Sequence, residues 1–334
     1  MKTLRKVFFR WEWLVIGLTV LVYIFFQARL HDSYTVVKLL DQTRVYVVDI
    51  GFMAIGTMMV LILGDIDISV GSTAALSVTV MGVAYNAGSG VSFWAAAALA
   101  LLTGAACGLI NGLLVVKFKE LFPMIITLST LTIYRGIAYI ILKDGAAGGF
   151  PTWFSKTLGY GSVLGGVPVM LLCLLAVFPV FYVLLHHTVF GRRLYATGTN
   201  IVAARYCGIR TDRIKVAVFT MNGLLAAVGG IMLLSRTGSV KYNIAAGYEM
   251  QAIAVAVLSG ASTAGGKGSV IGVLLSLCLL TCLKNGLMIA FNDSFILNLA
   301  IGVLLIGMVL LPNLYQMLRQ RREVKRQQLL TLHS

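Results

Sequence analysis

Long apolar runs, separated by short polar segments, fill most of this sequence and constrain its fold more than any other feature. Because a helix that crosses a membrane needs about 20 mostly apolar residues, these runs predict membrane spans. The composition agrees, since 59% of the residues are hydrophobic and only 12% are charged. A soluble globular domain carries about 25% charged residues. We therefore predict an all-α polytopic membrane protein and exclude an ordinary soluble one.

We expect about ten transmembrane helices in a single transmembrane domain, 1–334, with a core at 40–311 and a basic tail at 313–334. The runs at 70–85 and 249–264 are too short for a straight crossing, which favours tilted, broken or re-entrant segments. The predicted spans lie near 13–26, 44–63, 70–85, 93–116, 122–142, 167–187, 216–234, 249–264, 269–290 and 294–311.

The distribution of basic residues predicts the orientation. With ten crossings, 18 of the 27 Lys and Arg residues fall on the side that holds both termini, seven fall on the other side, and two lie within spans. Cytosolic segments of membrane proteins carry an excess of Lys and Arg, so both termini are predicted to be cytosolic. The formal charge of +15 then indicates contact with anionic membrane lipid rather than with nucleic acid.

A polar, basic segment at 188–215 interrupts the apolar runs on the predicted cytosolic side. Within it, Asn200 is placed to cap a short helix that ends near Tyr206 and carries a small Ala203-Ala204 face. Gly208 follows as a stop signal. A short capped helix between membrane spans is well placed to be pushed by a soluble partner.

Two glycine-containing breaks each join one apolar run to another. The first, G-D-I-D-I-S-V-G-S at 64–72, holds two carboxylates, and Asp67 or Ser69 is placed to cap the following helix. Two interpretations stay open: a cytosolic turn with a cap, or a helix break that lines a polar path. The second break, at 259–269, resembles a phosphate loop but has Ala261 and Gly268 where that loop needs Gly and Ser or Thr. We therefore expect no ATP hydrolysis by this chain.

A polar path for a solute is predicted at a small set of residues in or near spans. The hydroxyls among them suit a polyhydroxy solute, although Ser and Thr in helices also bond back to their own backbone. We expect no metal site and no catalytic residues, because the five cysteines form no CxxC pair and the four histidines do not cluster with them. The path candidates are Asp65, Asp67, Ser69, Asn111, Thr127 and Ser129.

Five motifs, in this order, resemble the membrane permease subunits of bacterial ribose-type ABC importers, which serve monosaccharides, rhamnose and autoinducer-2. The chain departs from the family at the first break, where Asp65 stands in place of a Gly, and at Ser259-Gly260-Ala261 in the second. The motifs are G-D-I-D-I-S-V-G-S (64–72), C-G-L-I-N-G-L-L-V (107–115), P-M-I-I-T-L-S-T-L (123–131), F-G-R-R-L-Y-A-T-G-T-N-I-V-A-A-R-Y-C-G-I (190–209) and A-I-A-V-A-V-L-S-G-A-S-T-A-G-G-K-G-S (252–269).

The resemblance implies a multi-pass protein of the bacterial inner membrane that works with several partners. These are an ATP-binding subunit that holds ATP and Mg²⁺, a second permease subunit, identical or a sister chain, and a periplasmic sugar-binding protein. By the same resemblance, the loop at 190–209 couples ATP-driven closure to the spans. The implied coupling residues are Asn200, Ala203, Ala204, Arg205, Gly208 and Ile209. Charge reversal at Arg205, or Ala204→Trp, is then expected to uncouple hydrolysis from uptake.

The alternative is an ion- or proton-coupled secondary transporter. Its coupling carboxylate would be Asp49, Asp65, Asp67 or Glu249. We expect few paired buried charges, and this scarcity counts against the interpretation. A membrane enzyme has no support from the sequence.

Overall fold

The computed structural model describes residues 11–86, 90–163 and 166–293, and a few isolated positions between 296 and 307. The basic N-terminus, most of the last predicted span (294–311) and the basic tail (313–334) lie outside the described residues.

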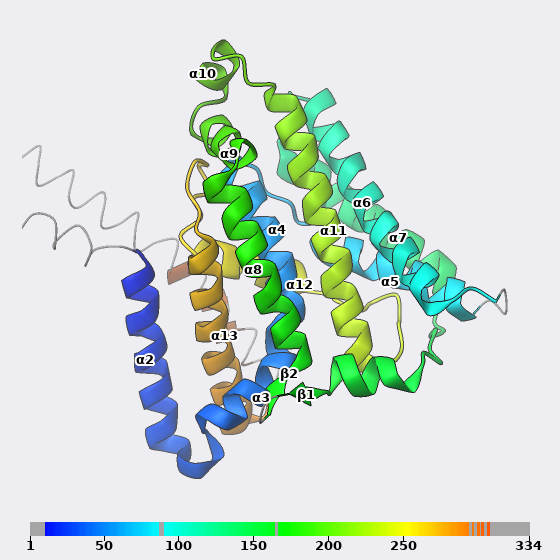
Figure 1. Cartoon of the computed structure of the whole chain (residues 1–334), viewed down its shortest axis with the longest axis vertical. Helices are drawn as coiled ribbons and strands as arrows, with labels where there is room; N and C mark the ends of the chain where they lie inside the picture. Colours follow the sequence, from blue (N-terminus) through cyan, green and yellow to red (C-terminus); the bar gives the residue numbers. More distant parts are fainter. Residues whose placement is uncertain are drawn as a thin grey trace, which may run out of the picture.

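The described residues form a bundle of helices, with α10 at one end and the α2–α3 connection at the other (Figure 1). A small antiparallel pair of strands near that second end departs from the all-helical prediction. The elements in order are α2 (Trp11–Leu30), η1 (His31–Ser33), α3 (Val36–Tyr46), α4 (Val48–Ile62), α5 (Val70–Asn86), α6 (Phe93–Lys117), α7 (Pro123–Leu142), η2 (Phe154–Gly159), β1 (Ser162–Val163), β2 (Val167–Pro168), α8 (Val169–His187), α9 (Val189–Thr199), α10 (Ile201–Tyr206), α11 (Thr211–Thr237), α12 (Tyr248–Leu258) and α13 (Val270–Phe291).

Six of the described helices, α2, α6, α7, α8, α11 and α13, are long and apolar enough to cross a membrane, and the bent pair α3–α4 makes a seventh candidate. The polytopic membrane class is thereby confirmed, whereas the total of ten spans stays a prediction.

The predicted span at 44–63 is wrong at its beginning. The chain bends by 68° between α3 and α4. Near this bend, Arg44 in the last turn of α3 pairs with Asp41 of the same helix and donates to the backbone oxygen of Tyr160 at 2.6 Å. The second contact attaches the end of α3 to the segment between η2 and β1.

The centre of the bundle is α4, in which every residue is buried. Beside it, α11 and α6 pack closely because α6 carries glycine at every fourth position, Gly104, Gly108 and Gly112. A Cβ atom at Gly108 would lie 2.2 Å from the backbone oxygen of Phe219 on α11. Glycines at this spacing let two helix backbones approach within van der Waals contact. The polar residues of the first break are held in this tightly packed centre.

Candidate functional site

Asp67, in the first break, is the centre of a buried polar cluster. Its side chain is 2% exposed, and its Oδ1 accepts hydrogen bonds from the backbone N–H (2.8 Å) and hydroxyl (2.7 Å) of Ser69. Its Oδ2 accepts from Asn222 of α11 at 2.9 Å. Asn111 of α6 donates to the Ser69 hydroxyl oxygen at 2.7 Å. A buried carboxylate is tolerated only with such partners, so the cluster fixes the break between α6 and α11.

Helix α7 holds the same break from another side. The Thr127 hydroxyl oxygen accepts from the backbone N–H of Ile68 at 3.2 Å. The Tyr134 hydroxyl lies 3.0 Å from Asn111 Oδ1. Sequence reasoning missed Tyr134, but a signal was present: Thr127, Thr130, Tyr134 and Ala138 are spaced as one buried face of α7.

Four of the six predicted path residues, Asp67, Ser69, Asn111 and Thr127, are thus brought together. Ser129 is not: it lies on the exposed face of α7, and its hydroxyl donates to the Ile125 backbone oxygen of its own helix at 3.0 Å. Its position follows the helical period, since two residues beyond Thr127 the side chain points roughly to the opposite side.

Asp65, the sixth candidate, forms an ion pair instead of joining the cluster. Lys215 Nζ lies 2.9 and 2.7 Å from its two carboxylate oxygens. The two side chains are 15% (Lys215) and 7% (Asp65) exposed, so the pair is largely shielded from water. Lys215 stands in the second turn of α11. Asp65, at which the chain departs from the family that it resembles, therefore ties the first break to α11, the helix that follows the predicted coupling segment at 190–209.

The expectation that few buried charges are paired is wrong. Besides Asp65–Lys215, Asp49 at the start of α4 is fully buried and lies 3.2 Å from Arg236 at the end of α11. The partners are 187 residues apart in the sequence, so no local pattern indicates them. Of the carboxylates proposed for a secondary transporter, Asp49 and Asp65 are thus each neutralised by a basic partner.

The short capped helix predicted after Asn200 is confirmed as α10. Asn200 Oδ1 accepts from the backbone N–H of Ala203 at 3.0 Å, and Gly208 follows with a φ of +77°, which favours glycine. The two alanines of the predicted Ala203-Ala204 face differ in burial, however: Ala203 is exposed to solvent, whereas Ala204 is buried, with 5% of its surface exposed. Consecutive residues of a helix point about 100° apart, so both cannot share one docking surface fully.

The outer surface of α10 is formed by residues that sequence reasoning missed. Tyr206 is 89% exposed and Val202 is 58% exposed. Arg205 is held within the chain, since its guanidinium donates to Asp212 Oδ1 and to the Thr211 hydroxyl, both at 2.9 Å. Ile209, also a predicted coupling residue, is half-buried and packs against the main core. Arg205 and Ile209 therefore attach α10 to the rest of the molecule, and Tyr206 and Val202 face outward.

Helix α9 joins α10 to the second break and to the end of α4, which precedes the first break. The backbone N–H of Gly266 in the second break donates to the Ile62 oxygen at the end of α4 at 2.8 Å. At this meeting point, a Cβ atom on Gly198 of α9 would lie 1.7 Å from that same oxygen. Tyr195, also on α9, donates its hydroxyl to the backbone oxygen of Gly268 in the second break at 2.8 Å. Burial raises the pKa of this phenol above its ordinary value. A Cβ atom on Gly265 would lie 2.5 Å from the Gly198 oxygen and 3.1 Å from the Gly64 nitrogen, so the second break lies between α9 and the first break.

Comparison with known protein families shows which family the chain belongs to. The family model described as the permease component of branched-chain amino acid transport systems matches residues 39–312. The chain belongs to this permease family. The membership confirms the resemblance seen in the five motifs, and the matched range contains both breaks and the coupling segment.

Individual relatives of this permease agree with the assignment. The chain is 36% identical over 258 residues to the autoinducer 2 import system permease protein LsrC of Yersinia pseudotuberculosis. The aligned region covers 77% of this chain and 72% of the relative. It is 37% identical over 262 residues to the ribose import permease protein RbsC of Bacillus subtilis, covering 78% and 80%. No solved structure matches the chain.

Proposed function

We propose that this permease is the translocation subunit of an ATP-binding-cassette importer for a monosaccharide-like solute. The relatives import ribose and autoinducer 2 by their names, so the candidates are a pentose, a hexose, a deoxyhexose such as rhamnose, or autoinducer-2. The solute arrives on a periplasmic binding protein. The chain crosses the bacterial inner membrane about ten times with both termini in the cytosol. A second permease subunit, identical or a sister chain, completes the path.

In this proposal the chain holds no cofactor of its own. ATP and Mg²⁺ are bound by the partner ATPase, since the second break has Ala261 and Gly268 where a phosphate loop requires other residues. The energy of hydrolysis then reaches the solute path only through contact between the subunits.

The observation that carries the proposal is the direct contact of α9 with the second break and with the end of α4, two residues before the first break. A partner that presses on the exposed face of α10 displaces α9, whose Tyr195 and Gly198 touch the second break and the end of α4. A second connection runs from Arg205 to Asp212 on α11. Movement of α10 therefore reaches the first break, which α11 holds through its ion pair and its asparagine.

The test is ATP-driven uptake in vesicles that contain the permease, its ATPase and its binding protein. Ala203→Trp places a large side chain on the exposed side of α10, and we expect at least a roughly tenfold loss of uptake with normal expression. Ala95→Trp, at an exposed alanine in the first turn of α6, is the matched control. The predicted Ala204→Trp is less suitable, because Ala204 is buried and the change disturbs α10 itself.

Two results would count against the proposal. Normal uptake by the Ala203→Trp protein would remove the coupling role of α10. Uptake that needs no ATPase subunit and collapses with a protonophore would instead establish the secondary transporter.

A further inference from the structure

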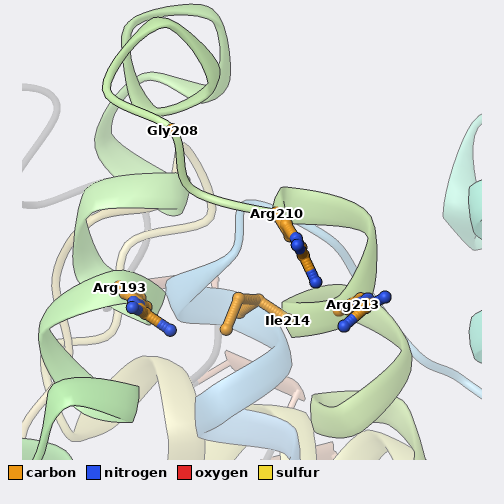
Figure 2. A pocket seen from close by; sticks show the side chains of 5 residues that line it. All are labelled: Arg193, Gly208, Arg210, Arg213 and Ile214. Carbon is orange, nitrogen blue, oxygen red and sulfur yellow. The ribbon is translucent and has the colours of Figure 1, made fainter.

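A pocket of about 360 Å³ lies between α9 and the beginning of α11. Arg193 from α9 stands on one side of it, Arg210 and Arg213 from the start of α11 stand on the other, and Ile214 lies between them (Figure 2). Gly208 completes the lining. We call this site the arginine pocket. No residue of α10 lines it, although Arg193 and Gly208 belong to the predicted coupling segment at 190–209, so the pocket adjoins the surface on which the coupling partner is proposed to press.

The three guanidinium groups of the arginine pocket make no side-chain hydrogen bond or ion pair to any described residue. Asp212, which lies between two of them in the sequence, is held instead by Lys119 and Arg205, at 3.1 and 2.9 Å. Asp65 is held by Lys215. Three exposed cations without an acidic partner among the described residues therefore line one concavity, and an anion that enters it finds positive charge on both sides. Guanidinium groups form bidentate bonds with phosphate in particular.

The position of the pocket relative to the membrane indicates which kind of anion can reach it. Helix α11 has 27 residues and is therefore about 40 Å long, whereas the hydrocarbon core of a bilayer is about 30 Å thick. Asp212, Arg213 and Lys215 lie in the first two turns of α11, and charged side chains are costly in the hydrocarbon core, so the excess length of α11 lies at this end, in the layer where lipid phosphates lie. Arg193 is in the second turn of α9, shortly after α8 ends at His187. A pocket of this volume falls in the range of about 300–1,000 Å³ of small-molecule sites.

We propose that the arginine pocket binds the phosphate group of an anionic phospholipid headgroup in the cytosolic leaflet. The three guanidinium groups hold the phosphate oxygens, and Ile214 offers an apolar wall to the adjoining part of the lipid. The site so formed attaches α9 and the start of α11, the two elements that flank α10, to the membrane surface. This inference rests on the orientation given in the proposed function, which puts this end of the bundle in the cytosol.

The test measures lipid binding to the purified chain in neutral detergent by native mass spectrometry and by thermal unfolding, with phosphatidylglycerol, phosphatidylcholine or inorganic phosphate added. The pocket variant carries Arg193→Gln, Arg210→Gln and Arg213→Gln. We expect it to bind phosphatidylglycerol at least about 100-fold more weakly than the native chain, since each lost charge-assisted contact costs roughly tenfold or more.

The control variant removes the same net charge at exposed residues outside the pocket, by Arg192→Gln, Lys117→Gln and Lys241→Gln. It is expected to keep the native affinity for phosphatidylglycerol. Equal unfolding temperatures of the two variants without lipid establish that both are folded. Because the isolated chain is measured without ATPase, binding protein or solute, the result does not depend on whether the proposed transport function holds.

Three results overturn the proposal. Equal phosphatidylglycerol affinity in the pocket and control variants removes the pocket as the site. Displacement of the lipid by millimolar inorganic phosphate, at matched ionic strength, assigns the pocket to a soluble phosphate. Unchanged lipid binding together with loss of ATPase-subunit binding in the pocket variant assigns it to an acidic surface of that subunit.

Discussion

Gly198 offers the sharpest test of the contact between the coupling segment and the breaks. A Cβ atom at this position would lie 1.7 Å from the Ile62 oxygen and 2.9 Å from the Gly266 nitrogen. Real Cβ atoms almost never come within 3.0 Å of a heavy atom outside their own stretch of chain, so Gly198→Ala forces α9 and the end of α4 apart by at least the 1.3 Å that separates 3.0 from 1.7.

The expected cost follows from this displacement. Overpacking of a dense interior costs about 1–3 kcal/mol, and the strained Gly266–Ile62 hydrogen bond adds about 0.5–1.5 kcal/mol. In the opposite direction, alanine in place of glycine within a helix raises the free energy of unfolding by up to about 1 kcal/mol, because alanine has the higher helix propensity. We therefore expect Gly198→Ala to lower the free energy of unfolding by about 1–3 kcal/mol and to reduce uptake per ATP hydrolysed.

The assay pairs equilibrium unfolding in mixed micelles with ATP-driven uptake in vesicles. Gly136→Ala on α7 is the matched control, because no atom lies within 4 Å of the place that a Cβ atom would take there. Its stability is expected to stay equal or to rise slightly. If Gly198→Ala matches Gly136→Ala in both stability and uptake, the close contact of α9 with α4 and the second break is refuted.

Two further predictions concern the polar contacts of the first break. Lys215→Ala leaves the Asp65 carboxylate buried without its partner and is expected to lower the free energy of unfolding by about 3–5 kcal/mol. The double variant, Asp65→Ala with Lys215→Ala, is expected to lose clearly less stability. A double-mutant cycle by equilibrium unfolding checks this, and a coupling energy near zero contradicts the ion pair. Asn222→Ala removes a donor that lies 2.9 Å from the buried Asp67 carboxylate. It is expected to lower the free energy of unfolding by about 2 kcal/mol, measured by equilibrium unfolding. An unchanged free energy of unfolding would contradict the role given to this hydrogen bond.

Local sequence signals predicted the helical membrane class, the glycine breaks and α10 with its asparagine cap. These features depend on residues close together in the chain: apolar runs of sufficient length, a capping side chain three residues from the amide it binds, and glycine at a positive φ. The division between Ala203 and Ala204 was not predicted, because it depends on what packs against α10.

The tertiary structure decided which partner each buried polar group takes. Asp65 meets Lys215 and Asp67 meets Asn222 across 150 and 155 residues of sequence, and α9 meets the end of α4 and the second break only because Gly198 lets their backbones approach closely. The sequence by itself determined that charges and glycines interrupt the spans, since burying them in lipid without a partner is costly. It did not determine their partners, since many basic and amide side chains can donate to a carboxylate, and packing decides which of them comes within hydrogen-bond distance.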